Sequence, residues 1–209
     1  MNKINKDFLI FFIFLLMANL SFSATNDYTE SYFLKSLSIE FPGKISGLEL
    51  SAINNFEERE KGLGIGLSYR SNGIKADVYI YNLGFNDITN GIDSELARMS
   101  FQRASMDIEA LAKGKIYNKL RVLSDNEIKK IGNIYFLSKK YNYIEGGSQK
   151  ESYLLLTCLK GNFIKIRLTY NIIADNDLNT VGENFLSDLS KILYDKNLNK
   201  GTEHAIDKN

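Results

Sequence analysis

The stretch YFLSKKYNYIEGGSQKESYLLLTCLKGNFIKIRLTY, residues 135–170, decides the fold. It predicts three strands, at residues 135–144, 153–159 and 163–170, separated by short glycine-containing turns. Strands joined by such short turns form an antiparallel meander. The middle strand is apolar on both of its faces, which is typical of a strand that is covered on both sides. We therefore expect a helix on each face of the sheet, or a helix on one face and loops on the other.

More strands flank this meander. Alternating or clustered apolar residues predict them at residues 38–41, 48–53, 63–70, 74–82, 120–123 and 127–131. The sequence Ser71-Asn72-Gly73 predicts a tight hairpin, because an Asn-Gly pair accepts positive φ at low cost. The glycine-rich run at residues 62–66 leads into this hairpin and not into a helix. We therefore interpret it as a bare sheet face under a closely packed helix, and not as a phosphate-binding loop.

Two segments have the spacing of amphipathic helices. In the first, Ser94 or Asp93 provides a cap, Gly114 a stop, and one face is apolar through residues 97, 101, 104, 108 and 111. The second opens at residues 175–177 and carries Val181, Phe185 and Leu189 on one face. The order strands, helix, strands, helix predicts an α+β fold, a mainly antiparallel sheet of about seven to nine strands with two main helices packed on it.

The first 23 residues have the pattern of a secretory signal peptide. Lys3 and Lys6 give a positive start, and an almost wholly apolar run of 13 residues follows at 8–20. Small residues then precede a cleavage site between Ser23 and Ala24. A membrane-spanning helix needs about 20 residues, so an uncleaved anchor ranks second. We expect a periplasmic or secreted protein without a stable membrane anchor after cleavage.

The chain that remains after cleavage suits one domain, because its 186 residues can bury a substantial core. We expect an N-terminal arm at residues 24–37, a single α+β domain at residues 38–194 and a disordered tail at residues 195–209.

The charge of the chain argues against nucleic acid as a partner. The whole sequence has a formal charge of +1, and its leader carries that excess, so the mature chain is near neutral. A neutral chain has no long-range attraction for a polyanion. We interpret the basic pairs at residues 129–130 and 139–140 as solvated strand edges or loops.

The composition is poor in residues for catalysis or metal binding. The only histidine, His204, lies in the polar tail, and Cys158 is the only cysteine. We therefore expect no catalytic constellation, no metal site and no cofactor. No disulfide can form within the chain. We interpret Cys158 as a small buried hydrophobe, and the alternative is a thiol that pairs with another chain.

The candidate binding residues lie on predicted strands. Tyr69, Tyr79 and Tyr81 combine apolar area with a hydroxyl group, and Tyr79 and Tyr81 share one strand face. Lys165 and Arg167 on the last strand of the meander supply charge to such a surface. Clustered tyrosines line ligand pockets and partner surfaces, and a second core layer beneath a helix is the alternative.

Three stretches resemble a family of uncharacterised exported bacterial proteins: SIEFPGKISGLEL (38–50), GLGIGLSYRSNGIKADVYIYNLG (62–84) and SYLLLTCLKGNFIKIRLTY (152–170). The shared pattern is Phe41-Pro42, Tyr69 with a Val-Tyr-Ile-Tyr strand at 78–81, and a Phe-Ile-Lys-Ile-Arg strand at 163–167. The order of strands and helices is similar to the PsbP-like fold. This resemblance implies a protein that binds other proteins and is not an enzyme, and it assigns no role to any residue.

These observations favour an exported, non-enzymatic binding or accessory protein of the bacterial cell envelope, whose partner is another protein. The first alternative is a small-ligand or lipid-binding module with an apolar pocket beneath the first helix. The second is a hydrolase with an unorthodox site built from Asp, Glu, Ser or Tyr. The sequence does not define the oligomeric state.

The leader generates a direct prediction. The mature protein from its native cells should begin at Ala24, because small residues at Ser21 and Ser23 fit the cleavage site. N-terminal sequencing and intact mass of the purified protein check this. A cytosolic protein that begins at Met1 would contradict it.

Overall fold

The protein is described by a computed structural model that covers residues 31–172 and 177–198. Eight strands form one antiparallel sheet in the order β3-β4-β5-β6-β10-β9-β8-β7, and β1 pairs with β2 apart from it. The elements are β1 Tyr32–Leu34, β2 Ile39–Phe41, β3 Lys44–Ile45, β4 Leu48–Asn55, β5 Ile65–Ser71, β6 Ile74–Tyr81, α2 Glu95–Lys113, β7 Asn118–Ile131, β8 Ile134–Glu145, β9 Ser148–Leu159, β10 Asn162–Asn171 and α3 Asp177–Leu198. The expected α+β class, with a large antiparallel sheet and two helices, is confirmed.

The predicted meander is confirmed as β8, β9 and β10, and each strand is longer than its sequence pattern indicated. β10 then pairs with β6, which places it between the meander and the hairpin formed by β5 and β6. The last meander strand therefore lies inside the sheet, with a strand hydrogen-bonded on either side.

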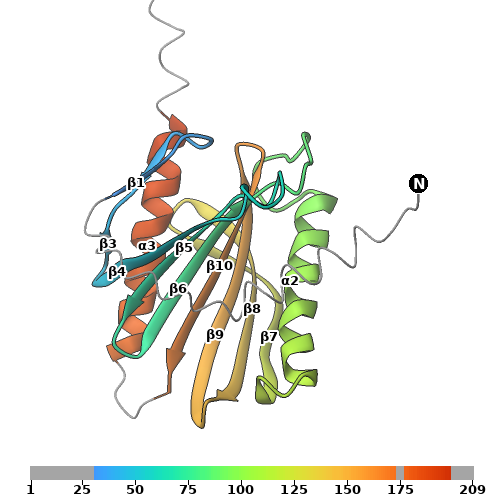
Figure 1. Ribbon diagram of the computed structural model, residues 1–209, viewed down its shortest axis with the longest axis vertical. Coiled ribbons are helices and arrows are strands. Elements are labelled where there is room, and N and C mark those ends of the chain that lie inside the picture. The colour runs from blue at the N-terminus through green and yellow to red at the C-terminus, as the bar shows by residue number, and fades with distance from the viewer. Residues whose placement is uncertain (1–30, 173–176, 199–209) are drawn as a thin grey trace, which may run out of the picture.

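The two helices cover opposite faces of the sheet, as Figure 1 shows. α2 packs against β7, β8 and β9, while α3 packs against β2, β3, β10 and β7. Alternation along the strands therefore makes two cores. We call them the α3-side core, which contains Phe185, Leu189 and Ile166, and the α2-side core, which contains Phe101, Ile108 and Leu154.

The caps of α2 follow from the sequence. The Ser94 hydroxyl accepts a hydrogen bond from the Ala97 backbone N–H at 3.1 Å, which satisfies one of the free donors of the first turn. The helix ends before Gly114. Its predicted apolar face, from Ala97 to Leu111, is buried.

Three local predictions need correction. Residues 120–123 and 127–131 belong to one strand, β7, because β8 pairs with both of them across irregular register. Lys139 is not a solvated strand residue, since it is buried on the α2 side of the sheet and paired with Glu109 and Asp125.

The glycine run also differs from its prediction. Gly62 and Gly64 precede β5 with positive φ, and a Cβ at Gly64 would stand 1.9 Å from the Ile80 carbonyl oxygen. At Gly66 the nearest side chains are those of Phe56 and Tyr79, and no helix covers it. Close approach to β6, and not packing against a helix, explains this run of glycines.

The domain boundaries differ slightly from those expected. β1 lies inside the expected arm of residues 24–37, because Leu34 and Leu37 are buried in the α3-side core. α3 runs to Leu198, into the expected tail. The leader at 1–23, the cleavage site at Ser23 and Ala24, and His204 lie outside the described residues.

β7 forms one edge of the sheet and has unusual pairing. It is 14 residues long, mostly exposed, and its register against β8 shifts at three places. Val122, Leu123 and Ile128 are its large exposed apolar side chains. β3, with two residues, forms the opposite edge.

The α3-side core generates a prediction about stability. Phe185 is fully buried, and its ring packs against that of Tyr69 with 5.4 Å between centroids. Phe185→Ala should lower the free energy of unfolding by about 3–5 kcal/mol, because it leaves a cavity. Met106→Ala on exposed α2 surface is the control and should change it by less than about 0.5 kcal/mol. Denaturant unfolding measures both, and equal effects would contradict this assignment of the core.

Candidate functional site

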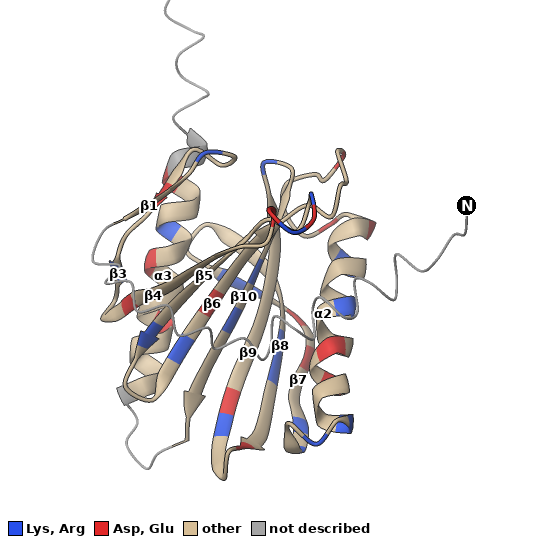
Figure 2. Cartoon of the chain, in the orientation of Figure 1, with Lys and Arg blue, Asp and Glu red and all other residues tan. Residues whose placement is uncertain are grey.

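The register of β6 and β10 brings four of the five candidate residues together. Lys165 lies opposite Tyr79, and Arg167 lies opposite Asp77. Tyr81 follows on the same face of β6, opposite Phe163. Figure 2 shows the resulting basic positions on β10, in the middle of the sheet. We call this side of β5, β6 and β10 the α2-side surface, with Arg70, Asp77, Tyr79, Lys165 and Arg167 as its defining residues.

Lys165 occupies the most buried part of this surface. Its Nζ lies 4.5 Å from the centroid of the Tyr79 ring and 5.7 Å from that of Tyr81, which are cation–π distances. Burial lowers the pKa of the Lys165 ammonium to about 7, an effect that the carboxylate of Asp107 opposes and the positive charge of Arg167 reinforces. Lys165 therefore changes charge near neutral pH.

Asp107 on α2 is the acidic neighbour of Lys165. Burial raises the pKa of its carboxyl group, and the positive charges of Lys165 and Arg103 oppose this shift. Arg103 lies one helical turn away, with 3.8 Å between its Nε and the Asp107 Oδ1. α2 thus supplies an acidic group beside Lys165 at the α2-side surface.

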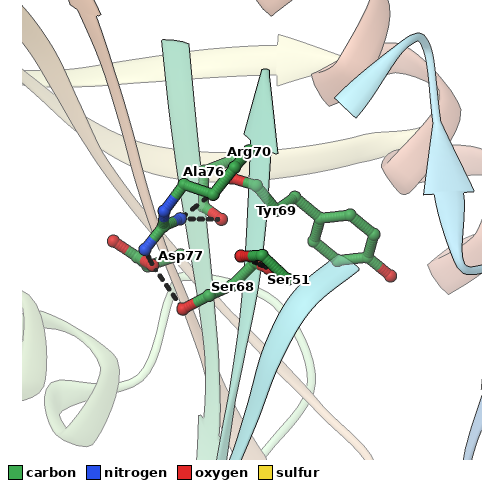
Figure 3. A network of polar contacts seen from close by, with 6 residues as sticks. All are labelled: Ser51, Ser68, Tyr69, Arg70, Ala76 and Asp77. Atoms are coloured by element: carbon green, nitrogen blue, oxygen red, sulfur yellow. Dashed lines mark hydrogen bonds and ion pairs between the residues drawn. The ribbon is translucent and has the colours of Figure 1, made fainter. Parts of the chain in front are cut away.

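A second cluster of polar contacts joins β5 to β6, shown in Figure 3. Arg70 Nη2 donates to Asp77 Oδ1 at 2.7 Å, and the Ser68 hydroxyl donates to the same oxygen at 2.8 Å. Arg70 also donates to the Tyr69 backbone carbonyl. Asp77 is therefore occupied by its neighbours on β5, although Arg167 lies directly opposite it on β10.

Arg167 is half-buried next to this cluster. Its Nε donates to the Ser152 hydroxyl at 3.1 Å, and its guanidinium carbon lies 6.0 Å from the Tyr141 ring centroid. Tyr117 and Tyr143, stacked with 4.1 Å between centroids, complete the aromatic surroundings. A guanidinium with aromatic faces around it is well suited to hold a planar anion.

Tyr69 lies apart from the other candidates. It projects to the opposite face of the sheet, where it is fully buried and its hydroxyl donates to the Pro42 carbonyl at 2.8 Å. Its ring belongs to the α3-side core, so we leave it out of the candidate site.

The sequence analysis missed Asp107, Tyr117 and Ser152. Helical spacing carried a signal for Asp107, because it follows Ala104 by three and precedes Leu111 by four positions, which places it beside the buried face. The contributions of β8 and β9 depend on strand register, which single-strand patterns do not define.

A separate groove of about 480 Å³ lies beside the β7–β8 hairpin. It forms where β8 leaves β9 and Gly91 pairs with Cys158 in its place. Ile92, Ile134, Tyr135 and Leu159 give it a mainly apolar lining. Burial raises the pKa of the Cys158 thiol at this groove to about 11, so that thiol stays protonated.

Residues 31–172 and 177–198 contain no group of three or more His, Cys, Asp or Glu side chains placed to hold a metal ion. Within those same residues, neither helix has the length and apolar character needed to cross a bilayer.

Lys165 generates a prediction about pH. The folded protein releases the Lys165 proton near pH 7, whereas the unfolded chain keeps it up to the ordinary pKa of 10.5. The unfolded state then binds more protons, so stability should rise by about 1–2 kcal/mol between pH 7 and pH 8.5. Lys165→Met should abolish this rise, and Lys75→Met, at a half-exposed position on the same strand face as Tyr79, should keep it. Denaturant unfolding across this range checks it, and parallel curves for wild type and Lys165→Met would contradict it.

Comparison with known proteins identifies the architecture. No family model matches the chain, and no curated protein matches its sequence. The solution structure of cyanobacterial PsbP (CyanoP) from Synechocystis sp. PCC 6803 is similar with a TM-score of 0.50 at 12% identity, over 79% of this chain and 94% of that one. LpqN from Mycobacterium tuberculosis, described as involved in cell envelope biogenesis, is a weaker match, with a TM-score of 0.33 at 12% identity over 68% of this chain and 80% of that one. The CyanoP match concerns architecture alone, and on that ground this chain has a PsbP-like α+β fold.

Proposed function

We propose that this protein is a non-enzymatic binding or accessory protein of the bacterial cell envelope, and that it contacts another protein through the α2-side surface. The leader-like residues 1–23 support the location, since they have the charge, apolar run and small residues of an export signal. The similarity of LpqN is too low to contribute to this argument.

One observation carries the proposal: a surface rich in tyrosine and arginine lies beside α2 and not beneath it. α2 packs over β7, β8 and β9, while Ser68, Arg70 and Lys75 on β5 and β6 keep part of their surface exposed. Tyrosine and arginine are enriched at the residues that dominate protein interfaces. Tyr79 and Arg167, both half-buried, offer this chemistry at the boundary between the covered and uncovered parts of the sheet.

The groove beside the β7–β8 hairpin supports a second function. Its volume of about 480 Å³ falls within the range of small-molecule sites, and its lining is mainly apolar. A small apolar ligand or lipid chain fits this chemistry. The groove lies at the edge of α2 where Asp93 precedes the helix, and not in the expected place beneath it. We rank this function second because the groove lies away from the α2-side surface with its tyrosine and arginine side chains.

Site-specific photocrosslinking in the native cells tests the primary function. A crosslinking amino acid at position 75 reports on the α2-side surface, and one at position 184 reports on exposed α3 surface on the other face of the sheet. We expect the same envelope proteins to be captured repeatedly from position 75 and not from position 184. Mass spectrometry identifies them, and equal capture from both positions would count against this surface.

A further inference from the structure

The guanidinium of Arg167 is held in place from one side only. Its Nε donates to Ser152, whose hydroxyl also shares a 2.8 Å hydrogen bond with Thr169 in the buried part of the sheet. Arginine has five N–H donors, so this bond leaves the four on the terminal nitrogens. Within the described residues, the terminal nitrogens have no hydrogen-bond acceptor, and they are not sealed from solvent. The group is fixed in position and has donors left for a ligand.

Neighbouring cations already have carboxylates. Arg70 pairs with Asp77 at 2.7 Å, and Lys139 pairs with Asp125 at 3.1 Å and Glu109 at 3.4 Å. Arg103 pairs with Asp107 in the same way. Arg167 forms no ion pair with any carboxylate in residues 31–172 and 177–198. Its charge therefore has no compensating acid among those residues.

The aromatic rings around Arg167 give the open position its shape. Tyr79, Tyr117, Tyr141 and Tyr143 come from β6, from the segment after α2 and from β8, and each of them interacts electrostatically with the guanidinium. Aromatic walls exclude water and so strengthen a charged hydrogen bond formed between them. Tyr117, Tyr141 and Tyr143 are buried behind the guanidinium, so a flat anion would reach its terminal nitrogens from the side of the half-buried Tyr79.

The local charges select the kind of anion. Asp77 lies directly opposite Arg167, and Asp107 acts on the neighbouring Lys165, so a doubly charged phosphate would be repelled more strongly than a singly charged group. A planar, singly charged carboxylate matches both the charge and the two-donor fork of a guanidinium.

We propose that Arg167 binds the carboxylate of a glutamate or aspartate side chain presented by the partner protein. This inference depends on the proposed function and adds to it the chemical group that the partner must carry at the centre of the contact. Tyr79, which is half-buried, packs against the stem of that side chain, and the Ser152 hydroxyl keeps the guanidinium oriented.

Titration of the folded protein with a blocked amino acid tests this directly. The probe is N-acetylglutamate N-methylamide, and the neutral control is its glutamine analogue. The readout is the shift of the backbone N–H NMR signals of Tyr79 and Ser152, which lie next to Arg167 and are present in every variant. We expect a saturable shift with the glutamate probe and none with the glutamine one. Arg167→Gln should weaken binding about tenfold or more. Arg167→Lys, which keeps the charge and loses the fork, should recover only part of it.

Lys75→Gln is the matched control, because Lys75 lies on the same face of the sheet as Arg167 and forms no ion pair within the described residues. Its loss removes one positive charge and should change the affinity by less than about twofold. Inorganic phosphate and phosphatidylglycerol vesicles are the competing anion sources. The proposal would be overturned if either of these bound more tightly than the glutamate probe in an Arg167-dependent way. It would also be overturned if the glutamate probe caused no shift, or a shift that Arg167→Gln leaves unchanged. Photocrosslinking from position 75 distinguishes failure of the carboxylate site from failure of the proposed function. If wild type and Arg167→Gln capture the same partners equally, the proposed function stands and the carboxylate site is rejected.

Discussion

The alternation of side chains along β10 is the constraint on which the rest of the structure depends. β10 is hydrogen-bonded to β6 on one side and to β9 on the other, so its side chains must serve both layers at once. Ile164, Ile166 and Leu168 enter the α3-side core, and Lys165 and Arg167 face the α2 side. A shift of one residue in register would bury both cations under α3 and move the aliphatic residues to the α2 side, so the polar pattern of β10 fixes its register.

Placing two cations in a central strand has an energetic cost that the surroundings offset in different ways. Lys165 is surrounded by tyrosine rings and Asp107, and it gives up its proton near neutral pH. Arg167 keeps its charge, because a guanidinium does not lose its proton in this range, and it relies on Ser152 and the neighbouring rings. An aliphatic residue at either position would avoid the cost of removing a charge from water, so these two cations are not explained by stability alone.

Local patterns were sufficient for most of the fold. Alternation predicted the meander, the Asn-Gly pair predicted the β5–β6 hairpin, and helical spacing predicted α2 with its Ser94 cap. Long-range pairing was not accessible in the same way, because nothing in a single strand shows that Lys165 meets Tyr79. Tyr69 illustrates this limit of single-strand patterns. Its aromatic ring and hydroxyl group suit a binding site, and only the pairing of β5 with β6 shows that it faces the α3-side core. The CyanoP similarity shows how the chain is arranged and leaves its chemistry to these side chains.

The irregular edge strand has a consequence for how the protein behaves at high concentration. A regular 14-residue edge strand with exposed apolar side chains would pair with strands of other molecules, which is the first step of fibril growth. The three register shifts of β7 bend its free hydrogen-bonding groups out of line, and Lys129 and Lys130 add like charges that repel a second rim. A variant of β7 that pairs with β8 without register shifts would therefore expose an edge to which further molecules can add in an amyloid-like assembly.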